Sequence, residues 1–277
     1  MNMIKISNLE FGYTRHAVLE GIDMQLDEGC IYGLLGENGV GKTTLLKLIS
    51  GLLKADRGEI EIGGLSPFSH SPLFLRNIYY VPEDFAAPEI PVEVFAKDYG
   101  VFYPHFDLAY FYELMRLFGV SPSSKFNRLS YGQQKKSVIA FALSLRTGVL
   151  LLDEPSNGLD IPSKSQLRRA ISESSGPDRT IVVSTHQVRD LENLFDPVII
   201  LDNKGVLLNA SVGEISEKLY FSVEKAMRPD ALYCEPAVGG YSQVSVNTDN
   251  SESAVDIEML FNAVLANRDR IKSIFNR

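Results

Sequence analysis

The sequence contains no tryptophan, few cysteines and no long hydrophobic run. Its two cysteines, Cys30 and Cys234, belong to no CxxC pair, so they indicate no thiol cluster for a metal and fit a reducing compartment. No segment approaches the roughly 18 apolar residues that a membrane-spanning helix requires. Residues 1–10 lack the basic and then apolar pattern of a signal peptide. We therefore expect a cytoplasmic protein whose work at a membrane is done through a partner.

Positive charge is also scarce in this sequence. It has 27 lysine and arginine residues against 35 aspartate and glutamate residues, which gives a formal net charge of −8. Sequence-independent binding to DNA or RNA requires a basic surface, so we expect no nucleic-acid partner. Hydrophobic residues make up 45% of the chain, which is enough for a packed core.

Short apolar segments alternate with helical patterns along most of the chain. Helices are predicted at about 42–52 and over most of 88–147. Strands are predicted at 30–35, 59–62, 79–81, 149–152, 181–184 and 198–201. This alternation is typical of a mainly parallel sheet that is covered on both faces. The composition changes near residue 215, so residues 216–277 are interpreted as a small C-terminal appendage.

One segment matches the phosphate-binding loop G-x-x-x-x-G-K-[ST] without a mismatch. It follows a predicted strand, opens a predicted helix, and consists of Gly36, Glu37, Asn38, Gly39, Val40, Gly41, Lys42 and Thr43. Glycines let the backbone curl so that successive N–H groups point at phosphate oxygens, and the helix N-terminus adds positive potential. Lys42 can reach the β- and γ-phosphates of ATP, and Thr43 can place its hydroxyl on Mg²⁺.

An apolar run ends in two adjacent carboxylates, Asp153 and Glu154. At the carboxyl end of a buried parallel strand these side chains emerge where open α/β sheets bind ligands. Asp153 would hold Mg²⁺ directly or through water, and Glu154 would orient and deprotonate the attacking water. Neighbouring residues of a strand point to opposite faces, so the two acids can take different tasks.

Further segments narrow this broad class of nucleotide-binding proteins. Residues 129–133 read Leu-Ser-Tyr-Gly-Gln and resemble the LSGGQ signature of ABC ATPases, upstream of the acidic strand as in that family. The other segments that match the family in order are Tyr13 for the adenine-stacking aromatic, Tyr80–Glu83 for the Q-loop, Ser156–Asp160 for the D-loop and Thr185–His186 for the switch histidine.

The resemblance covers residues 1 to about 215 and carries a fold with it. It implies an α/β P-loop NTPase with a mainly parallel core sheet and an antiparallel β subdomain at the N-terminus. A helical insertion at about 88–147 and the α+β appendage at 216–277 would complete the chain.

The resemblance also implies a dimer that binds two ATP molecules, with Mg²⁺, between head-to-tail subunits. The signature residues Ser130, Tyr131, Gly132 and Gln133 would close over the γ-phosphate that the other subunit's Lys42 loop holds. A capped helix start suits this task because its free N–H groups face an anion. In the same subunit as the loop, His186 would contact the γ-phosphate and hold the attacking water, with Lys42 and Glu154 as the other catalytic residues. Asp160 would link the two sites across the interface.

The sequence departs from the family pattern at two positions. Tyr131 replaces the first signature glycine, while Gly132 keeps the second, so the backbone can still approach a phosphate closely there. Glu83 replaces the usual Q-loop glutamine. A glutamate oxygen can still bind Mg²⁺, but its negative charge near the γ-phosphate is expected to alter hydrolysis or coupling.

Two aromatic residues compete for the adenine position. Phe11 and Tyr13 lie on the same face if their strand continues, and an aromatic in such a strand usually belongs to the core. We predict that Phe11 is the core residue and that Tyr13 stacks on adenine, as the family pattern implies. Thr44, which follows Thr43, is expected among the ATP contacts.

A membrane partner is the last implication of the resemblance. An integral membrane permease would hold the pair of ATP-binding subunits, identical or different, at the inner face of the cell membrane. An unusual concentration of aromatic residues follows Glu83, namely Phe85, Phe95, Tyr99, Phe102 and Tyr103. Most of them can belong to the core of the helical insertion, and one or two exposed ones could form the docking groove. Residues 102–107 resemble a segment of bacterial exporter-type ATPases, which favours export.

Two other functions fit part of the sequence. A soluble ABC-type ATPase that acts on ribosomes or DNA typically carries two cassettes or a long coiled-coil insertion, and neither pattern is present. A second alternative, a regulatory ATPase that hydrolyses ATP weakly, remains because Glu83 replaces the usual glutamine. A nucleotide kinase or GTPase is disfavoured by the segments at Ser130 and His186.

Overall fold

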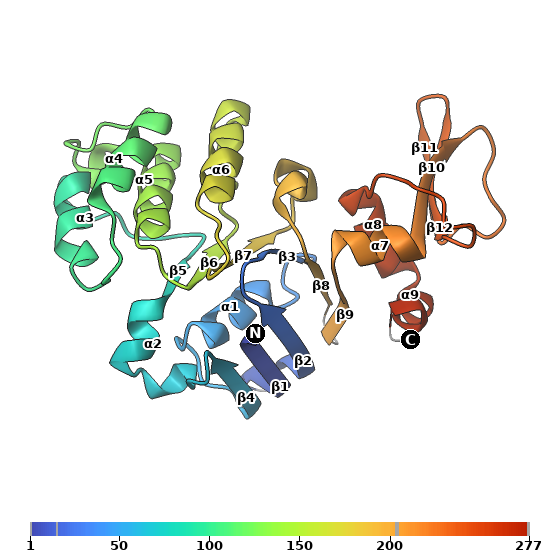
Figure 1. Ribbon diagram of the computed structural model, residues 1–277, viewed down its shortest axis with the longest axis horizontal. Coiled ribbons are helices and arrows are strands. Elements are labelled where there is room, and N and C mark those ends of the chain that lie inside the picture. Colours follow the sequence, from blue (N-terminus) through green and yellow to red (C-terminus); the bar gives the residue numbers. More distant parts are fainter. Residues whose placement is uncertain (1, 15, 203–204, 276–277) are drawn as a thin grey trace.

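The computed structural model describes residues 2–14, 16–202 and 205–275. Its centre is a mixed sheet, in which five parallel strands are followed by β9, antiparallel to β8. In sheet order the strands are β5 (Ile78–Val81), β6 (Val149–Asp153), β7 (Thr180–Thr185), β3 (Ile31–Leu35), β8 (Val198–Asp202) and β9 (Gly205–Ala210). Strands β6, β7 and β8 are buried throughout because both faces of the sheet are covered. The predicted α/β fold with a mainly parallel core is confirmed (Figure 1).

A second, antiparallel sheet is built from the N-terminal region, as predicted. Its order is β2-β1-β4, with β1 at Asn2–Tyr13, β2 at His16–Asp27 and β4 at Arg57–Ile62. Helix α1 (Lys42–Ile49) joins this sheet to the central one, because a single hydrophobic cluster contains Ile6 of β1, Leu46 of α1 and Leu151 of β6. Core packing therefore fixes the start of α1, where the glycine-rich loop ends.

Helices cover the other face of the central sheet (Figure 1). They include α3 (Val92–Gly100), α4 (Leu108–Leu117), α5 (Tyr131–Ser144) and α6 (Ile161–Glu173). One face of α4 packs into the core, since Phe111 and Met115 are buried, as is Phe118 at its C-terminal end. The helix ends before Gly119, whose φ of 64° lies in the left-handed region that glycine tolerates.

Shorter helical segments connect these elements. They are η1 (Pro67–Ser69), α2 (Pro72–Asn77), η2 (Phe126–Arg128), η3 (Val188–Asp190) and η4 (Glu192–Leu194). Of these, α2 leads directly into the edge strand β5.

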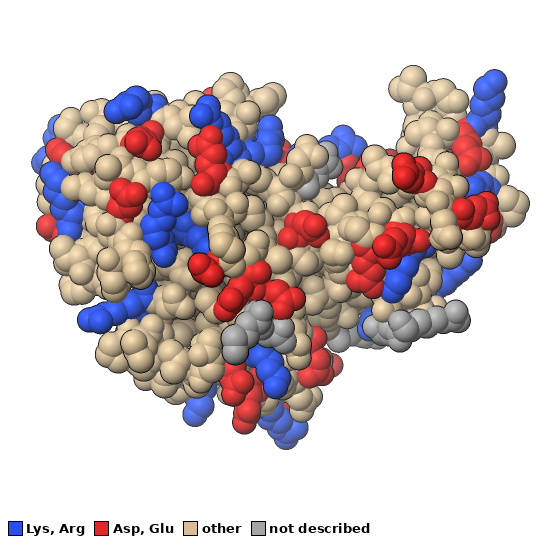
Figure 2. Space-filling view, viewed as in Figure 1, with Lys and Arg blue, Asp and Glu red and all other residues tan. Residues whose placement is uncertain are grey.

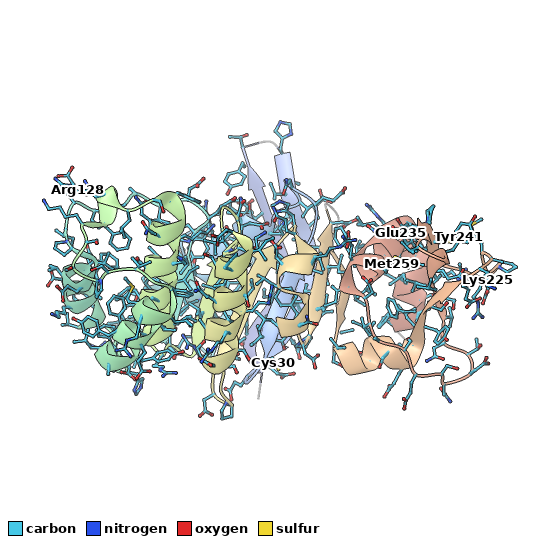
Figure 3. The ribbon with its side chains drawn as sticks, turned by 90° about the horizontal axis from the view of Figure 1, so that it is seen from above. Cys30, Arg128, Lys225, Glu235, Tyr241 and Met259 are labelled. Carbon is cyan, nitrogen blue, oxygen red and sulfur yellow. The ribbon has the colours of Figure 1, made fainter. Side chains whose placement is uncertain are left out.

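The C-terminal part of the chain carries its own three-stranded antiparallel sheet, of order β10-β12-β11. Its elements are α7 (Val212–Lys218), β10 (Leu219–Glu224), β11 (Tyr233–Ala237), β12 (Gly240–Val246), α8 (Ile257–Ala266) and α9 (Arg268–Phe275). Two ion pairs tie it to the central part, Arg189 with Glu258 and Arg268 with Asp202. Seen from above, it lies at the opposite end of the molecule from the α3–α5 helices, with Lys225 and Tyr241 at one end and Arg128 at the other (Figure 3).

Candidate nucleotide site

The glycine-rich loop connects β3 to α1, and its backbone conformation explains its glycines. Gly39 and Gly41 have φ angles of 85° and 105°, which residues with a side chain rarely adopt. At Gly36 an added Cβ would lie 2.7 Å from the carbonyl oxygen of Leu201. Gly41 caps α1 without any side-chain hydrogen bond, so the first N–H groups of the helix keep their capacity to bind an anion.

Lys42 is the cationic centre of this loop. Its side chain is buried, and its ammonium donates hydrogen bonds to the carbonyl oxygens of Gly36 at 2.7 Å and Glu37 at 3.1 Å. The ammonium also lies 3.7 Å from Oε1 of Glu154. Burial lowers the pKa of Lys42, while the carboxylates of Glu154 and Asp153 oppose that shift.

Asp153 ends strand β6 and is buried below the loop. Its Oδ1 accepts a hydrogen bond from the hydroxyl of Ser184 at 2.5 Å, and its Oδ2 accepts one from the hydroxyl of Tyr80 at 3.0 Å. Burial and the charge of Asp153 raise the pKa of Tyr80, which keeps that phenol a hydrogen-bond donor. A carboxylate offers about four lone-pair sites, so Asp153 retains acceptor capacity for a further partner.

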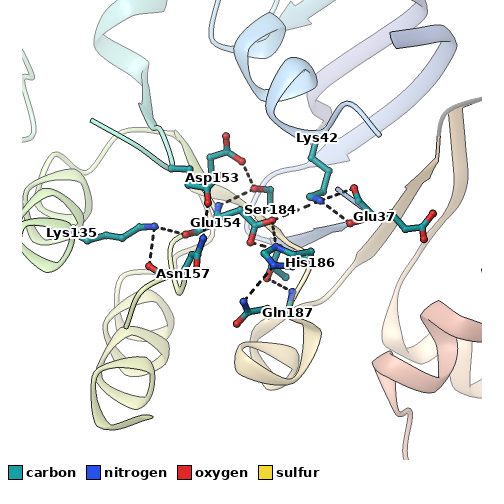
Figure 4. A network of polar contacts seen from close by, with 12 residues as sticks. Glu37, Lys42, Lys135, Asp153, Glu154, Asn157, Ser184, His186 and Gln187 are labelled. Atoms are coloured by element: carbon teal, nitrogen blue, oxygen red, sulfur yellow. Dashed lines mark hydrogen bonds and ion pairs between the residues drawn. The ribbon is translucent and has the colours of Figure 1, made fainter. Parts of the chain in front are cut away.

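Glu154 follows Asp153 and turns away from it, because its φ of 45° is left-handed. Its backbone N–H is held by Ser184, at 3.2 Å from the carbonyl oxygen and 3.0 Å from the hydroxyl oxygen. Its Oε1 lies 2.8 Å from Nδ1 of His186 and 3.7 Å from Nζ of Lys42. Residues that follow β6 and β7 thus meet the first residue of α1 at one carboxylate (Figure 4).

These residues border a pocket of about 630 Å³ at the carboxyl ends of the central strands. Its lining consists of Tyr13, Val18, Asn38, Gly39, Gly41, Lys42, Thr43, Thr44, Glu83, Glu154, Asn157 and His186. Ten of these twelve were predicted as site residues; sequence reasoning missed Val18 and Asn157. The pocket combines free helix N–H groups, a buried ammonium and a carboxylate beside a histidine, which suits a polyphosphate and the hydrolysis of its end.

About half of the chain, residues 19–157, matches the family model described as ABC transporter. The chain belongs to this family. Over 82% of its length it is 28% identical to the ABC transporter ATP-binding protein YtrB of Bacillus subtilis (strain 168), and the match covers 78% of YtrB. The protein is an ABC ATPase, as the sequence resemblance implies.

Solved structures agree with this assignment. A structure described as an ATP binding subunit of an ABC transporter has a TM-score of 0.70 and 29% identity, covering 77% of this chain and 91% of that one. The structure of cbiO1 from Clostridium perfringens is described as part of the ABC transporter complex cbiONQ. It has a TM-score of 0.64 and 26% identity, and the match covers 76% of this chain and 88% of that one. Among the described residues of this ABC ATPase, no helix has the length and apolarity needed to cross a membrane.

Tyr13 and Phe11 differ in burial. Phe11 is buried, whereas the side chain of Tyr13 is 47% exposed at the pocket. The two rings contact edge to face, with centroids 5.0 Å apart. The hydroxyl of Tyr13 lies 3.5 Å from that of Thr44. Tyr13 therefore presents an accessible aromatic face at the edge of this ABC ATPase pocket.

Glu83, the unusual Q-loop residue of this ABC ATPase, is tied to two other motifs. Its Oε1 accepts a hydrogen bond from the amide of Asn157 at 2.6 Å, and its carbonyl oxygen accepts one from the hydroxyl of Tyr131 at 3.1 Å. The same hydroxyl lies 3.3 Å from Oδ1 of Asp84. A neutral donor, the amide of Asn157, thus holds the Glu83 carboxylate beside the pocket, and Tyr131 holds its backbone.

The signature segment begins helix α5 with the predicted capping box. Gln133 N–H donates to the Ser130 hydroxyl at 3.4 Å, and Ser130 N–H donates to Oε1 of Gln133 at 3.1 Å. None of residues 130–133 is among the described residues that line the pocket. Asp160 also lies outside it, where it caps α6 by accepting a bond from the N–H of Ser163 at 2.9 Å. The structure therefore separates residues 130–133 and Asp160 from the phosphate loop of the same chain, whereas Asn157 of the D-loop lines the pocket.

The donor groups at the pocket fit Mg²⁺ bound together with a nucleotide. This cation prefers oxygen ligands and keeps water and phosphate oxygens in its shell, so few protein ligands suffice. Thr43 offers a hydroxyl, Asp153 a buried carboxylate and Glu83 a second carboxylate at the pocket wall. Within the described residues, no group of three or more acidic, histidine or cysteine side chains could hold a metal by itself.

Proposed function

We propose that this ABC ATPase is one half of an ATP-driven clamp that powers transport, in the direction of export, through a separate membrane permease. The observation that carries the hydrolytic part is the convergence of Lys42 and His186 on the carboxylate of Glu154 at one pocket. A buried cation, a base and a hydrogen-bonding imidazole are the groups that phosphoryl transfer to water requires.

The roles of the residues follow from their positions. The loop N–H groups and Lys42 neutralise the β- and γ-phosphates, while the ring of Tyr13 stacks on adenine. Thr43, Asp153 and Glu83 would hold Mg²⁺ directly or through water, and a bound ion would supply positive charge beside the phosphate oxygens. Glu154 accepts the proton of the attacking water, whose position His186 helps to fix.

A second ATP-binding subunit would complete the site. Ser130 and Gly132 lie outside the pocket of their own chain, yet the start of α5 is exposed and carries N–H groups suited to an anion. In a head-to-tail pair these residues approach the γ-phosphate held by the partner, and Asp160 lies near the interface. Hydrolysis removes contacts of the γ-phosphate and lets the two subunits separate.

The test uses Glu154→Gln in the purified chain. Since a positioned base contributes about 10²- to 10⁴-fold, turnover should fall by that factor while ATP binding persists. A dimer stabilised by ATP should then accumulate in size-exclusion chromatography with multi-angle light scattering. Hydrolysis at the wild-type rate in this variant would show that Glu154 is not the base.

An apolar groove favours the permease as the third component. A cavity of about 390 Å³ is lined by Ser50, Leu52, Leu75, Ile78, Tyr79, Tyr80, Tyr99, Phe102, Tyr103 and Phe141. Of the five aromatic residues noted in the sequence, Tyr99 and Phe102 are exposed here, whereas Phe85, Phe95 and Tyr103 pack against the core. Most of the surface around neighbouring α2 is uncharged in Figure 2, although α2 itself carries Arg76. Phe102→Ser should abolish co-purification with the permease and leave basal hydrolysis unchanged.

The same proposal includes the direction of transport, the location of the subunit in the cell and the division of the chain into domains. Export is favoured by residues 102–107 and would be tested by ATP-dependent uptake into inverted vesicles. The complex with the permease would keep this subunit peripheral at the inner face of the cell membrane. We assign residues 1–215 to the ATP-binding domain, since the solved ATP-binding subunit covers 77% of this chain, and residues 216–277 to the appendage.

Glu83 favours one alternative function, a regulatory ATPase with weak hydrolysis. Its carboxylate brings a negative charge to a pocket meant for a polyphosphate, which opposes the charge that develops during hydrolysis. A steady-state ATPase measurement decides between the two functions, because a transport subunit must turn over repeatedly when its permease is present.

A further inference from the structure

Lys135 is a fully buried lysine to which the mechanism above gives no role. It lies on α5, two residues after the last signature residue, Gln133, and none of its side chain is exposed. Removing an ammonium from water is costly unless hydrogen bonds and nearby charge replace the lost solvent. A lysine in this position therefore requires specific partners.

The partners of Lys135 are backbone carbonyls next to the acidic strand. Its Nζ donates hydrogen bonds to the carbonyl oxygens of Glu154 at 2.6 Å and of Asn157 at 3.3 Å (Figure 4). Burial lowers the pKa of Lys135, and the carboxylates of Glu83 and Glu154 oppose that shift. The ammonium is thus enclosed between the Q-loop, the end of β6 and the loop that follows.

Glu154 requires such a partner because its backbone is strained. Its φ of 45° is uncommon for a residue with a side chain, and such a conformation persists only where the surroundings impose it. Ser184 holds its N–H group, and Lys135 holds its carbonyl oxygen. Together they fix both peptide groups of the residue whose carboxylate lies between Lys42 and His186.

The side chain of Tyr131 follows the same face of α5. It precedes Lys135 by four residues, so the two side chains are neighbours on the helix. The ammonium lies 5.7 Å from the centre of the Tyr131 ring. A Cβ on Gly158 would come within 2.9 Å of this ring, so the ring packs directly on the loop after Glu154. The helix start and the loop therefore form one packed unit.

We propose that Lys135 is a positioning residue that holds the catalytic base of its own subunit and couples it to the start of α5. The inference rests on the proposed function, in which Ser130 approaches the nucleotide held by the partner. Any displacement of α5 on that contact moves the hydrogen-bond donor of the Glu154 carbonyl. In a head-to-tail pair, nucleotide bound at the Lys42 loop of one subunit thereby affects the position of Glu154 in the other subunit.

The first experiment compares Lys135→Met with Lys136→Met in the full chain. Lys136 is the adjacent lysine, and its ammonium reaches only the hydroxyl of Ser163 at 3.3 Å among the contacts of the described residues. Lys135→Met should lower kcat by roughly 10- to 100-fold, because a small displacement of a catalytic group has that effect. Its KM for ATP and its Kd for a non-hydrolysable ATP analogue should change little. Lys136→Met should match wild type, and Lys135→Arg should restore part of kcat.

A double-mutant cycle separates positioning from general destabilisation. In the Glu154→Gln background the base is already absent, so Lys135→Met should cause no further loss of kcat. A further loss of the same factor there, or a folded Lys135→Met protein with wild-type kcat, would overturn the proposal. If Lys135→Met does not fold, Lys135→Gln keeps a polar side chain that ends one atom short of the lysine Nζ and loses the short contact with the Glu154 carbonyl, so wild-type kcat in that variant would overturn the proposal equally. Absence of hydrolysis by wild type would instead contradict the proposed function.

Discussion

In the proposed function the phosphate loop and the signature segment both contact phosphate, but the chain places them in opposite surroundings. The loop is enclosed: its lysine is buried, Gly39 and Gly41 adopt left-handed conformations, and the charged partner Glu154 directly follows a central strand. The signature segment is open: Ser130 and Gln133 satisfy each other in a capping box, and Tyr131 is 43% exposed. The phosphate loop has its charged partners within the same chain, whereas the start of α5 is exposed to solvent.

This difference indicates how the two regions share one task. A buried cation holds its phosphate tightly in a single subunit, since low exposure strengthens electrostatic interactions. An exposed helix start has its N–H groups available only when another surface brings the phosphate to it. Under the proposed function, a site divided in this way would assemble when two subunits meet and come apart when the γ-phosphate leaves.

The largest expected effect is the change in ATP hydrolysis when two impaired variants, Lys42→Ala and Ser130→Ala, are mixed. Lys42→Ala should lower hydrolysis by roughly 10²- to 10³-fold, since it removes a preorganised cation at the phosphate. Ser130→Ala should lower it by about tenfold or more, since it removes a hydrogen bond to a charged group. In mixed dimers one site combines an intact Lys42 with an intact Ser130. The mixture should therefore hydrolyse ATP faster than either variant alone.

The control for this experiment is a mixture of Lys42→Ala with Glu154→Gln. Both residues serve the same pocket, so in a mixed dimer each subunit's own pocket carries a defect. This mixture should gain no activity. A gain of hydrolysis in this control mixture would contradict the division between an enclosed and an open region. The same conclusion would follow if the mixture of Lys42→Ala with Ser130→Ala gained no activity.

The enclosed region was largely predictable from the sequence because its residues are close together along the chain. The loop from Gly36 to Thr43 is continuous, and its chemistry depends on glycines and a lysine at fixed spacing. The strand before Asp153 was equally clear, since four apolar residues end in two acids. The fold followed from the same alternation of strands and helices.

The residues that support the site were not predictable in this way. Ser184, Tyr80 and Asn157 reach Asp153, Glu154 or Glu83 across 30 or more positions in the sequence. Lys135 looked like one of two adjacent helical lysines, and only its burial distinguishes it from Lys136. Side-chain partners that tertiary packing brings together leave no spacing pattern in a single sequence.

A smaller effect is expected where the two regions meet, at Glu83. Glu83→Gln keeps the oxygen that accepts the Asn157 hydrogen bond and removes one negative charge from the pocket. Hydrolysis should become faster by a few-fold, because less negative charge opposes that of the γ-phosphate. The Mg²⁺ concentration for half-maximal activity should stay nearly constant. Steady-state rates across a Mg²⁺ titration test both statements, and unchanged ATPase and transport would contradict the role given to Glu83.

A modest stability effect is expected on the open side, at Tyr131. Tyr131→Phe removes the hydrogen bonds of the hydroxyl to Glu83 and Asp84 but keeps the ring on Gly158. The free energy of unfolding should fall by about 1 kcal/mol, the usual net value of a hydrogen bond. Chemical denaturation measures it. Ser121→Ala, which removes an exposed hydroxyl pair with Ser123, is the matched control and should have less effect.

The smallest expected effect is a dependence of stability on pH that arises from the buried ammonium of Lys42 in the enclosed region. The pKa of Lys42 is lowered in the folded chain, mainly by burial, whereas in the unfolded chain it has the ordinary lysine value of about 10.4. Between these two values the unfolded chain binds the proton and the folded chain does not. Stability without nucleotide therefore rises with pH through this window.

The measurement is the free energy of unfolding of wild type minus that of Lys42→Met, followed upward from about pH 8. The difference should shift in favour of wild type as the pH rises, because the variant has no proton to lose at this position. ATP reverses the sign: its phosphates favour the charged ammonium, so the stabilisation by ATP should shrink over the same window. Ser130→Ala has no titrating group to remove, so its difference from wild type should stay flat. If the difference in free energy of unfolding between wild type and Lys42→Met does not change with pH, the loop lysine is as solvated as the signature surface. That result would contradict the contrast between the two regions.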